Sequence, residues 1–216
     1  SSAMSMPFPG KLGRMSALRL AEEAVTATGL RRALGIAALN ALSAIADERR
    51  GPGFHRVVED ADAFDLAAVR PEETAVVVGA FGPFLKALRR IGARHFVLEK
   101  DPATLRPHEM EHYRPAETFA EVVPEAHVLL ITGTTLINGT LDELVACAQP
   151  DARVVLVGPT APMVPDAFFR RRHSLLGTVR VTDADALLDV LAEGGSGYHF
   201  FGKTARKIVL APLETP

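Results

Sequence analysis

The chain has 216 residues, a formal net charge of -2, 48% hydrophobic residues and 23% charged residues. This balance is typical of one globular α/β domain, alone or with an appendage, and it argues against nucleic-acid binding because positive charge is not in excess. No apolar run reaches the roughly 18 residues that span a bilayer, and no signal-peptide pattern opens the chain. The single cysteine, Cys147, excludes an intrachain disulfide. We therefore expect a cytoplasmic protein with no membrane partner.

Two helices and a connector are predicted over residues 1–70. Residues 16–28 form an amphipathic pattern, with Ser16 as a possible N-cap. Residues 30–48 are rich in Ala and Leu and apolar on most faces, which indicates a helix packed against a larger body. The polar stretch 49–70 is then interpreted as a connector. Because these helices would expose apolar surface, we expect a homo-oligomer, in the simplest case a homodimer.

Strands and helices alternate in the second segment, residues 71–216. Apolar, β-branched runs predict strands, and segments of helical period separate them. Continuous apolar strands that alternate with helices indicate a parallel sheet covered on both faces. We therefore predict a doubly wound, mostly parallel Rossmann-like α/β domain. The predicted strands are 75–79, 95–99, 126–132, 153–157, 174–181 and 207–210, and the predicted helices are 83–91, 141–148 and 183–192.

Residues 128–141, VLLITGTTLINGTL, pass from a buried strand into a loop rich in hydroxyls and glycine, and then into a helical pattern. Parallel α/β folds bind their ligands outside the carboxyl ends of the strands, where such a loop would lie. The loop offers hydroxyls, an amide and close backbone approach, but no obvious catalyst. We expect ligand contacts from Thr132, Gly133, Thr134, Thr135, Asn138, Gly139 and Thr140.

The first strand of the domain ends in a glycine-rich turn, and Glu99 closes the second strand twenty positions after Gly79. An acidic residue at that place holds ribose hydroxyls in dinucleotide-binding folds. The fingerprint would also require glycines at 81 and 84, where this chain has Phe81 and Phe84. A tight turn that contacts some ligand is therefore favoured over an NAD site. The predicted contacts of this turn are Gly79, Phe81, Gly82 and Pro83, together with Glu99.

A second small-residue loop, formed by Gly158, Pro159 and Thr160, follows the strand at 153–157. Successive strands of such a sheet are usually neighbours, so this loop should lie beside the loop at 132–140. We include its three residues among the predicted ligand contacts.

Residues 108–112 spell HExxH, the pattern by which a helix presents two histidines to zinc in metalloproteases. Pro107 and Pro115 leave room for barely two helical turns in a polar connection. A surface helix with solvated histidines is therefore favoured over a protease. His108 and His112 stay candidates for a metal site without proteolysis, from the i, i+4 spacing alone.

Several motifs together resemble one known family: VVVGAFGPF, the strand that ends in Glu99, ITGTTLINGTL, VGPTAPMVP, and GTVRVTD with EGG. Over residues 71–207 the chain is similar to the DUF364 family, whose description is "putative heavy-metal chelation". The helix segment GIAALNAL, which contains Asn40, is similar to the family's segment that leads into this domain. The resemblance implies a ligand site between the Rossmann-like domain and a preceding domain like the N-terminal domain of enolase.

The chain departs from this family pattern at its start. About thirty residues precede Arg31, with no convincing strand among them, so we expect most of the preceding domain to be missing. Either the remaining helices or a second subunit would then close the crevice, with Asn40 approaching from the helices.

Two hypotheses for function follow. The first is a protein that binds a small anionic or metal-chelating ligand, with a heavy-metal ion or metal complex as the implied cofactor, at the carboxyl edge of the sheet. The second is a Rossmann enzyme that uses NAD(P) or S-adenosylmethionine, with Glu99 on the ribose and His199 or Lys203 as acid or base. Those two residues lie in the glycine-rich segment 194–203, which is either a lid or a mobile connection. Catalytic residues stay unassigned, and so does the question whether the protein is an enzyme.

Overall fold

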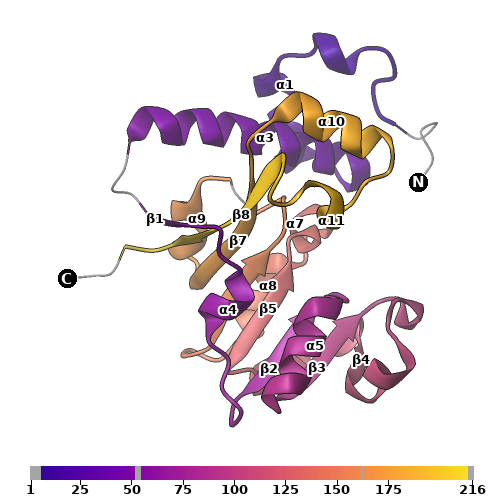
Figure 1. Ribbon diagram of the computed structural model, residues 1–216, viewed down its shortest axis with the longest axis vertical. Helices are drawn as coiled ribbons and strands as arrows, with labels where there is room; N and C mark the ends of the chain where they lie inside the picture. The colour runs from indigo at the N-terminus through magenta and orange to yellow at the C-terminus, as the bar shows by residue number, and fades with distance from the viewer. Residues whose placement is uncertain (1–5, 52–54, 162, 214–216) are drawn as a thin grey trace.

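The computed structural model describes residues 6–51, 55–161 and 163–213, and these form an eight-stranded sheet with helices on both faces (Figure 1). The strand order is β1-β8-β7-β6-β5-β2-β3-β4. Strands β2 to β7 all run parallel to one another, whereas β8 is antiparallel to both β7 and β1. The predicted mostly parallel, doubly wound sheet is therefore confirmed. The strands are β1 Arg56–Glu59, β2 Thr74–Val78, β3 Arg94–Glu99, β4 Tyr113–Pro115, β5 Val128–Thr132, β6 Arg153–Val157, β7 His173–Val181 and β8 Ala205–Ala211.

The winding of the sheet reverses between β2 and β5. The chain passes outward from β2 to β3 and β4, crosses back to the other side of β2, and continues through β5, β6 and β7. Strands β2 and β5 are thus parallel neighbours, with Val78 paired to Ile131 at their carboxyl ends. Connections that leave this point in opposite directions do not fill the space above it, which makes it the preferred ligand position in open α/β sheets.

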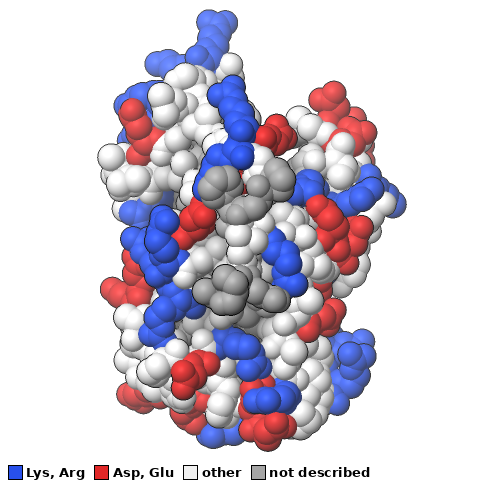
Figure 2. Space-filling view, turned by 90° about the vertical axis from the view of Figure 1, so that its left-hand side faces the viewer, with Lys and Arg blue, Asp and Glu red and all other residues white. Residues whose placement is uncertain are grey.

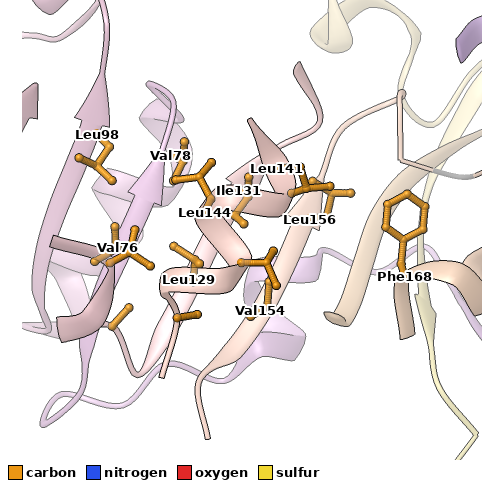
Figure 3. Packing of buried hydrophobic residues seen from close by; sticks show 14 of the residues in the cluster. Val76, Val78, Leu98, Leu129, Ile131, Leu141, Leu144, Val154, Leu156 and Phe168 are labelled. Atoms are coloured by element: carbon orange, nitrogen blue, oxygen red, sulfur yellow. The ribbon is translucent and has the colours of Figure 1, made fainter. Parts of the chain in front are cut away.

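Helices cover both faces of the sheet, and alternate residues of each strand point to opposite faces. On one face, Val77 and Leu130 pack with α4 and α5. On the other face, Val76, Leu129 and Leu156 pack with α6, α8 and α9. Figure 3 shows these strand residues with the labelled side chains of α8 and α9. Burial on both faces explains why these strands are continuous apolar runs. The helices are α4 Ala63–Ala67, α5 Gly82–Ile91, α6 Phe119–Val122, α7 Thr134–Asn138, α8 Leu141–Cys147, α9 Pro165–Phe169, α10 Ala184–Ala192 and α11 Gly197–Phe200.

Three helices precede the sheet: α1 Ala17–Ala21, α2 Glu23–Thr26 and α3 Gly29–Arg50. The single helix predicted over 16–28 is divided in two at Glu22, although Ser16 caps its start as predicted by accepting the amide of Arg19. Helix α2 packs tightly on α3 because Gly35 has no side chain: a Cβ there would lie 2.2 Å from the backbone nitrogen of Ala24. No helix in the described part of the chain meets the length and hydropathy that a membrane span requires.

The stretch predicted to be a connector contains two regular elements. Strand β1 pairs with β8 at the edge of the sheet, and α4 begins at Asp62, whose side chain accepts the amide of Phe64. Strand β1 has four residues, of which only the middle two are partly buried, so it lacks a hydrophobic run that would indicate a strand. Helix α4 has five residues, too few for a helical period to be visible in the sequence.

Charged side chains of both signs are interspersed on the face shown in Figure 2. Neither the basic nor the acidic residues form one continuous field over that face. This face therefore shows no basic stripe of the kind that follows a phosphate backbone.

An ion pair between the buried carboxylate of Glu73 and the partly exposed Arg153 joins the amino-terminal ends of β2 and β6. Both guanidinium Nη atoms of Arg153 donate to Glu73, at 2.9 and 2.7 Å, and Arg70 adds a backbone and a side-chain donor. The Glu73 side chain is only 4% exposed. These hydrogen bonds, with that from Arg153 first, lower the pKa of Glu73 to about 2 in spite of its burial. The edge of the sheet opposite the strand carboxyl ends is therefore held by a fully bonded carboxylate.

We expect Glu73→Gln to lower the free energy of unfolding at pH 7 by on the order of 2 kcal/mol, since it removes a buried charge whose cationic partners are partly exposed. The folded pKa of Glu73 is depressed, so its contribution is complete above the ordinary value of 4.5 and is lost as the pH falls toward 2. Urea unfolding at pH 7 and pH 3 measures both effects. Glu72→Gln is the matched control, because Glu72 forms an exposed pair with Arg70; equal losses from the two variants would contradict the assignment.

Candidate functional site

A cavity of about 540 Å³ opens at the carboxyl ends of β2, β3 and β5, where the winding of the sheet reverses. Hydroxyl groups and backbone line one side, and Glu99, Lys100 and Glu117 bring charge to it. The residues that line it are Val78, Gly79, Ala80, Phe81, Leu98, Glu99, Lys100, Ala116, Glu117, Phe119, Thr132, Thr134, Thr135, Asn138, Thr140 and Leu144.

The turn after β2 requires glycine at position 79. Gly79 has a φ of +101°, and a Cβ on it would lie 3.2 Å from Cγ2 of Thr132 on the neighbouring strand. The next amide, that of Ala80, donates to Oε2 of Glu99 at 3.0 Å, and the amide of Lys100 donates to Oε1 at 2.7 Å. Glu99 therefore ties the turn after β2 to the end of β3, and its carboxylate is held in place by backbone donors.

The loop after β5 brings three threonine hydroxyls to the cavity. The Thr134 hydroxyl lies 3.1 Å from that of Thr132, and the Thr135 hydroxyl donates to the Thr132 carbonyl at 2.7 Å. The predicted loop thus contains a short helix, α7, which ends at Gly139 with a φ of +75°. The side chains of Asn138 and Thr140 also reach the cavity from this segment. Small side chains here leave room for a ligand and still offer hydrogen bonds.

The loop after β6 packs against the loop after β5, as their order in the sheet predicts. The Gly133 amide donates to the Val157 carbonyl at 2.7 Å. A Cβ on Gly133 would lie 2.0 Å from Oγ1 of Thr160, so the two loops touch at a residue without a side chain. Helix α3 joins this contact because Nδ2 of Asn40 donates to the Pro159 carbonyl at 3.1 Å.

The structure brings about half of the sequence-predicted contacts into one cavity. Its walls include Gly79, Phe81, Glu99, Thr132, Thr134, Thr135, Asn138 and Thr140. The other predicted contacts do not line it, namely Asn40, Gly82, Pro83, Gly133, Gly139, Gly158, Pro159 and Thr160; of these, Asn40 and Pro159 line a separate groove and Gly139 a third hollow. Sequence reasoning missed Val78, Leu98, Leu144, Ala80, Lys100, Ala116, Glu117 and Phe119. The last three follow β4, a strand of three residues that has no sequence signature of its own.

The two phenylalanines after β2 stack on each other, and Phe81 also lines the cavity. Phe81 stacks on Phe84 with ring centroids 5.0 Å apart, and Phe84 stacks on Phe64 of α4 at 5.1 Å. Phe84 is buried and anchors α5 to the sheet. In a dinucleotide fingerprint, glycine at position 81 would let the pyrophosphate approach the backbone and glycine at position 84 would let the helix pack closely on the strand, and this turn has neither.

The HExxH segment forms a 3-10 helix, Pro107–His112, in place of the expected surface α-helix. Residues four apart on a 3-10 helix lie about 120° from each other around its axis, so His108 and His112 do not share a face. The His112 ring instead stacks on His95, with centroids 3.8 Å apart. Glu109 accepts the backbone amide of Arg106 at 2.8 Å and is buried. His112 and Glu109 of this segment are therefore engaged in local contacts, and the segment does not present a pair of histidines to a metal.

Among the described residues, no group of three or more His, Cys, Asp or Glu side chains is placed to hold a metal ion. The cavity itself offers two carboxylates, from Glu99 and Glu117, and no imidazole or thiolate. Soft heavy metals prefer thiolate and imidazole ligands. The residues present therefore do not fit a bare heavy-metal ion, whereas their hydroxyls and amides fit an oxygen-rich organic ligand.

The contact between the two loops predicts a measurable coupling. Gly133 has an ordinary φ of -60°, so Gly133→Ala introduces a clash with Thr160 and no backbone strain. We expect a loss of about 1–2 kcal/mol in the free energy of unfolding, as overpacking typically costs. In a Thr160→Ala background the same change should cost at least about 1 kcal/mol less. A double-mutant cycle by urea unfolding measures this, and strictly additive losses would show that the loops do not touch.

His95 predicts an acid-sensitive stability. Burial lowers the pKa of His95, and the neighbouring His112 adds to this, while Glu111 opposes it. Below about pH 6.5, His95 therefore binds a proton more readily in the unfolded chain than in the folded chain. The contribution of His95 to the free energy of unfolding is complete above that pH and decreases as the pH falls. His95→Asn should flatten the dependence of the unfolding free energy on pH between about 6.5 and 5. His108→Asn, at an exposed position, is the control; an unchanged slope in His95→Asn would contradict the assignment.

Comparison with known proteins agrees with this architecture. The chain is 28% identical over 177 residues to an uncharacterised protein of Methanocaldococcus jannaschii, an alignment that covers 81% of this chain and 64% of that protein. Among solved structures, a DUF364 protein of unknown function from Pyrococcus horikoshii superposes with a TM-score of 0.75 at 21% identity, covering 91% of this chain and 75% of the other. One from Desulfitobacterium hafniense gives 0.70 at 20% identity, covering 91% and 74%.

The chain thus spans somewhat under two thirds of the length of its curated relative. Two family models match it, and both are described as putative heavy-metal chelation. The DUF4213 model matches residues 2–43, which end within α3, and the DUF364 model matches residues 62–210. The second match covers most of the sheet, including the strand ends that form the cavity, and on this ground the chain belongs to the DUF364 family.

Proposed function

We propose that this protein binds a small anionic or metal-chelating molecule, alone or as its metal complex, in the cavity at the carboxyl ends of β2, β3 and β5. The observation that carries the proposal is a cavity of about 540 Å³ at the reversal point of the sheet, with hydroxyls, an amide and backbone on its walls. Its size lies within the usual range for small-molecule sites. Its position is where open α/β sheets bind ligands.

A chelated metal suits the site better than a bare ion. Described side chains supply no cluster of metal ligands, so an organic chelator would have to coordinate the metal. The threonine hydroxyls and Asn138 could then donate to the carboxylates of the chelator. Cys147 does not serve as a ligand here, since it packs beside the core on α8. This interpretation accords with the family description of heavy-metal chelation.

Two features favour negative charge on the ligand. Helix α5 begins beside the cavity, at Gly82, with no side chain capping its first turn. The aligned peptide dipoles of a ten-residue helix place partial positive charge there. Lys100 adds a full charge on the cavity wall. The carboxylates of Glu99 and Glu117 on the same wall oppose this, but that of Glu99 is already bound by backbone amides.

The alternative, an enzyme with NAD(P) or S-adenosylmethionine, has less support. Phe81 and Phe84 stand where a dinucleotide fingerprint has glycines, and Glu99 is engaged by amides. The acid or base candidates His199 and Lys203 do not line the cavity. His199 instead lies on α11, where its Nδ1 accepts the amide of Ser196 at 3.0 Å.

The assembly and cellular setting are part of the same proposal. Leu18 is 70% exposed and Val25 82% exposed on the first two helices, which supports burial of this surface in a homodimer. The two family matches, which end at residue 43 and begin at residue 62, support a division into a helical N-terminal segment and a Rossmann-like domain. We place the protein in the cytoplasm, without a nucleic-acid or membrane partner, on its single cysteine and its slight net charge.

Protein purified without chelators is expected to show a mass increment in native mass spectrometry, with its metal content given by elemental analysis. Thr134→Leu combined with Asn138→Leu should abolish the increment, because bulky apolar side chains would fill the cavity and remove donors. The ligand-induced rise in Tm should vanish with it. Thr26→Leu, on an exposed position of α2, is the control. A double variant that retains the increment would remove this loop from the site, and binding of NAD(P) or S-adenosylmethionine at millimolar concentration would favour the enzyme.

A further inference from the structure

A second hollow, unconnected with the proposed function, lies between α3 and the β7–β8 pair. It is a groove of about 880 Å³, and it shares no lining residue with the cavity at β2 and β5. Ile208 and Leu210 form its floor on the face of the sheet that α8 and α9 also cover. Figure 1 shows α3, α10 and α11 gathered around this end of β7 and β8.

The walls of the groove are mainly apolar. They come from α3, α10 and the strand ends, and include Ala41, Ala44, Val179, Leu187 and Leu191. Leu191 is 48% exposed, so water contacts apolar surface that a filled groove would bury. A hollow of this size and lining is typical of sites for small organic molecules.

Two buried polar atoms in the groove have no hydrogen-bond partner among the described residues: Nδ1 of His55 and Oδ1 of Asn40. The His55 side chain is 5% exposed, and its Nε2 lies 3.5 Å from Oδ2 of Asp47. That carboxylate favours the proton on Nε2, which leaves Nδ1 of the neutral ring as an acceptor. Asn40 donates its Nδ2 to the Pro159 carbonyl, so its free atom is also an acceptor.

The two acceptors lie toward the two ends of an apolar stretch of α3. His55 lies beside Asp47, which therefore marks its position along α3. Asn40 and Asp47 are seven residues apart, so they lie on one face of the helix and about 10 Å apart along its axis. Ala44 lies between them on the groove wall. An occupant would therefore need a hydrogen-bond donor near each end and an apolar middle.

The charged side chains around the groove do not favour an anionic ligand. Arg50 pairs with Asp166 at 2.8 Å, and Arg180 pairs with Glu59, so both cations have carboxylate partners. Asp47 and Glu48 add negative charge to the wall of the groove. Neutral or cationic donors are favoured in such surroundings.

We propose that this groove is a second ligand site, which binds an elongated apolar molecule with a hydroxyl or amine at each end. His55 lies outside both segments that the family models match. This acceptor is thus assigned from a residue outside the family matches, whereas Asn40 and the apolar walls from β7, α10 and β8 lie within them.

Fluorescence of N-phenyl-1-naphthylamine, which rises when the dye enters an apolar site, tests the proposal. Ala44→Trp should fill the groove and weaken dye binding at least tenfold. Ala103→Trp, at an exposed position after β3 that does not line the groove, should change it less than twofold. Equal binding by the two variants would overturn the site. A wild-type dimer that Ala44→Trp dissociates, with no dye binding, would also overturn it and assign the groove to a second copy.

Displacement of the dye tests the role of the acceptors. Octane-1,8-diol carries a hydroxyl at each end, and 1,8-dimethoxyoctane has the same chain without donors. In His55→Phe, the concentration of diol that displaces half of the dye should rise at least fivefold, and that of the ether less than twofold. Equal changes for diol and ether would show that Nδ1 of His55 does not recognise a donor. If His55→Phe fails to fold, Asn40→Leu takes its place with the same expected results.

Discussion

The rest of this structure depends on the neighbouring parallel strands β2 and β5. The chain winds away from these two strands in opposite directions. Because β2 leads outward to β3 and β5 leads to β6, their loops diverge above the sheet and leave a hollow. The hollow can stay open only if the strand ends themselves approach closely. Gly79 against Thr132, and Gly133 against Thr160, meet that need with positions that have no Cβ.

The two edges of the sheet consequently differ in character. At the amino-terminal edge, the ion pair of Glu73 and Arg153 fastens β2 to β6 with every carboxylate oxygen bonded. At the carboxyl edge, the carboxylate of Glu99 is bound by backbone amides, while threonine hydroxyls border a cavity of about 540 Å³. An amino-terminal edge held by an ion pair and a carboxyl edge with a polar cavity suit a protein that binds a ligand. The cavity walls are rich in oxygen atoms, and for this reason we favour a chelated metal over a bare ion.

The sequence predicted the parallel sheet well because its central strands are buried on both faces and are therefore continuous apolar runs. It also located the β5 loop and Glu99, since the loop directly follows such a strand and Glu99 is the last residue of another. It could not predict β1, β4 or the contacts at Glu117 and Phe119, because short strands of three or four residues carry no periodic signal. The HExxH spacing pointed toward a metal through α-helical geometry, but neighbouring prolines and the His95–His112 stack produce a 3-10 helix. Which loop residues line the cavity depended on tertiary packing, as with Gly133, which touches Thr160 and not the cavity.

The central claim is that the ligand lies at the carboxyl ends of β2, β3 and β5. A crystal structure of the protein with its copurified ligand, with anomalous data collected at the edge of any metal found by elemental analysis, tests this most directly. The account predicts ligand density between Gly79, Glu99 and Thr134, with any metal bound by the organic molecule and not by a cluster of side chains. Density confined to the neighbourhood of His108 and His112, with the cavity filled only by water, would contradict it.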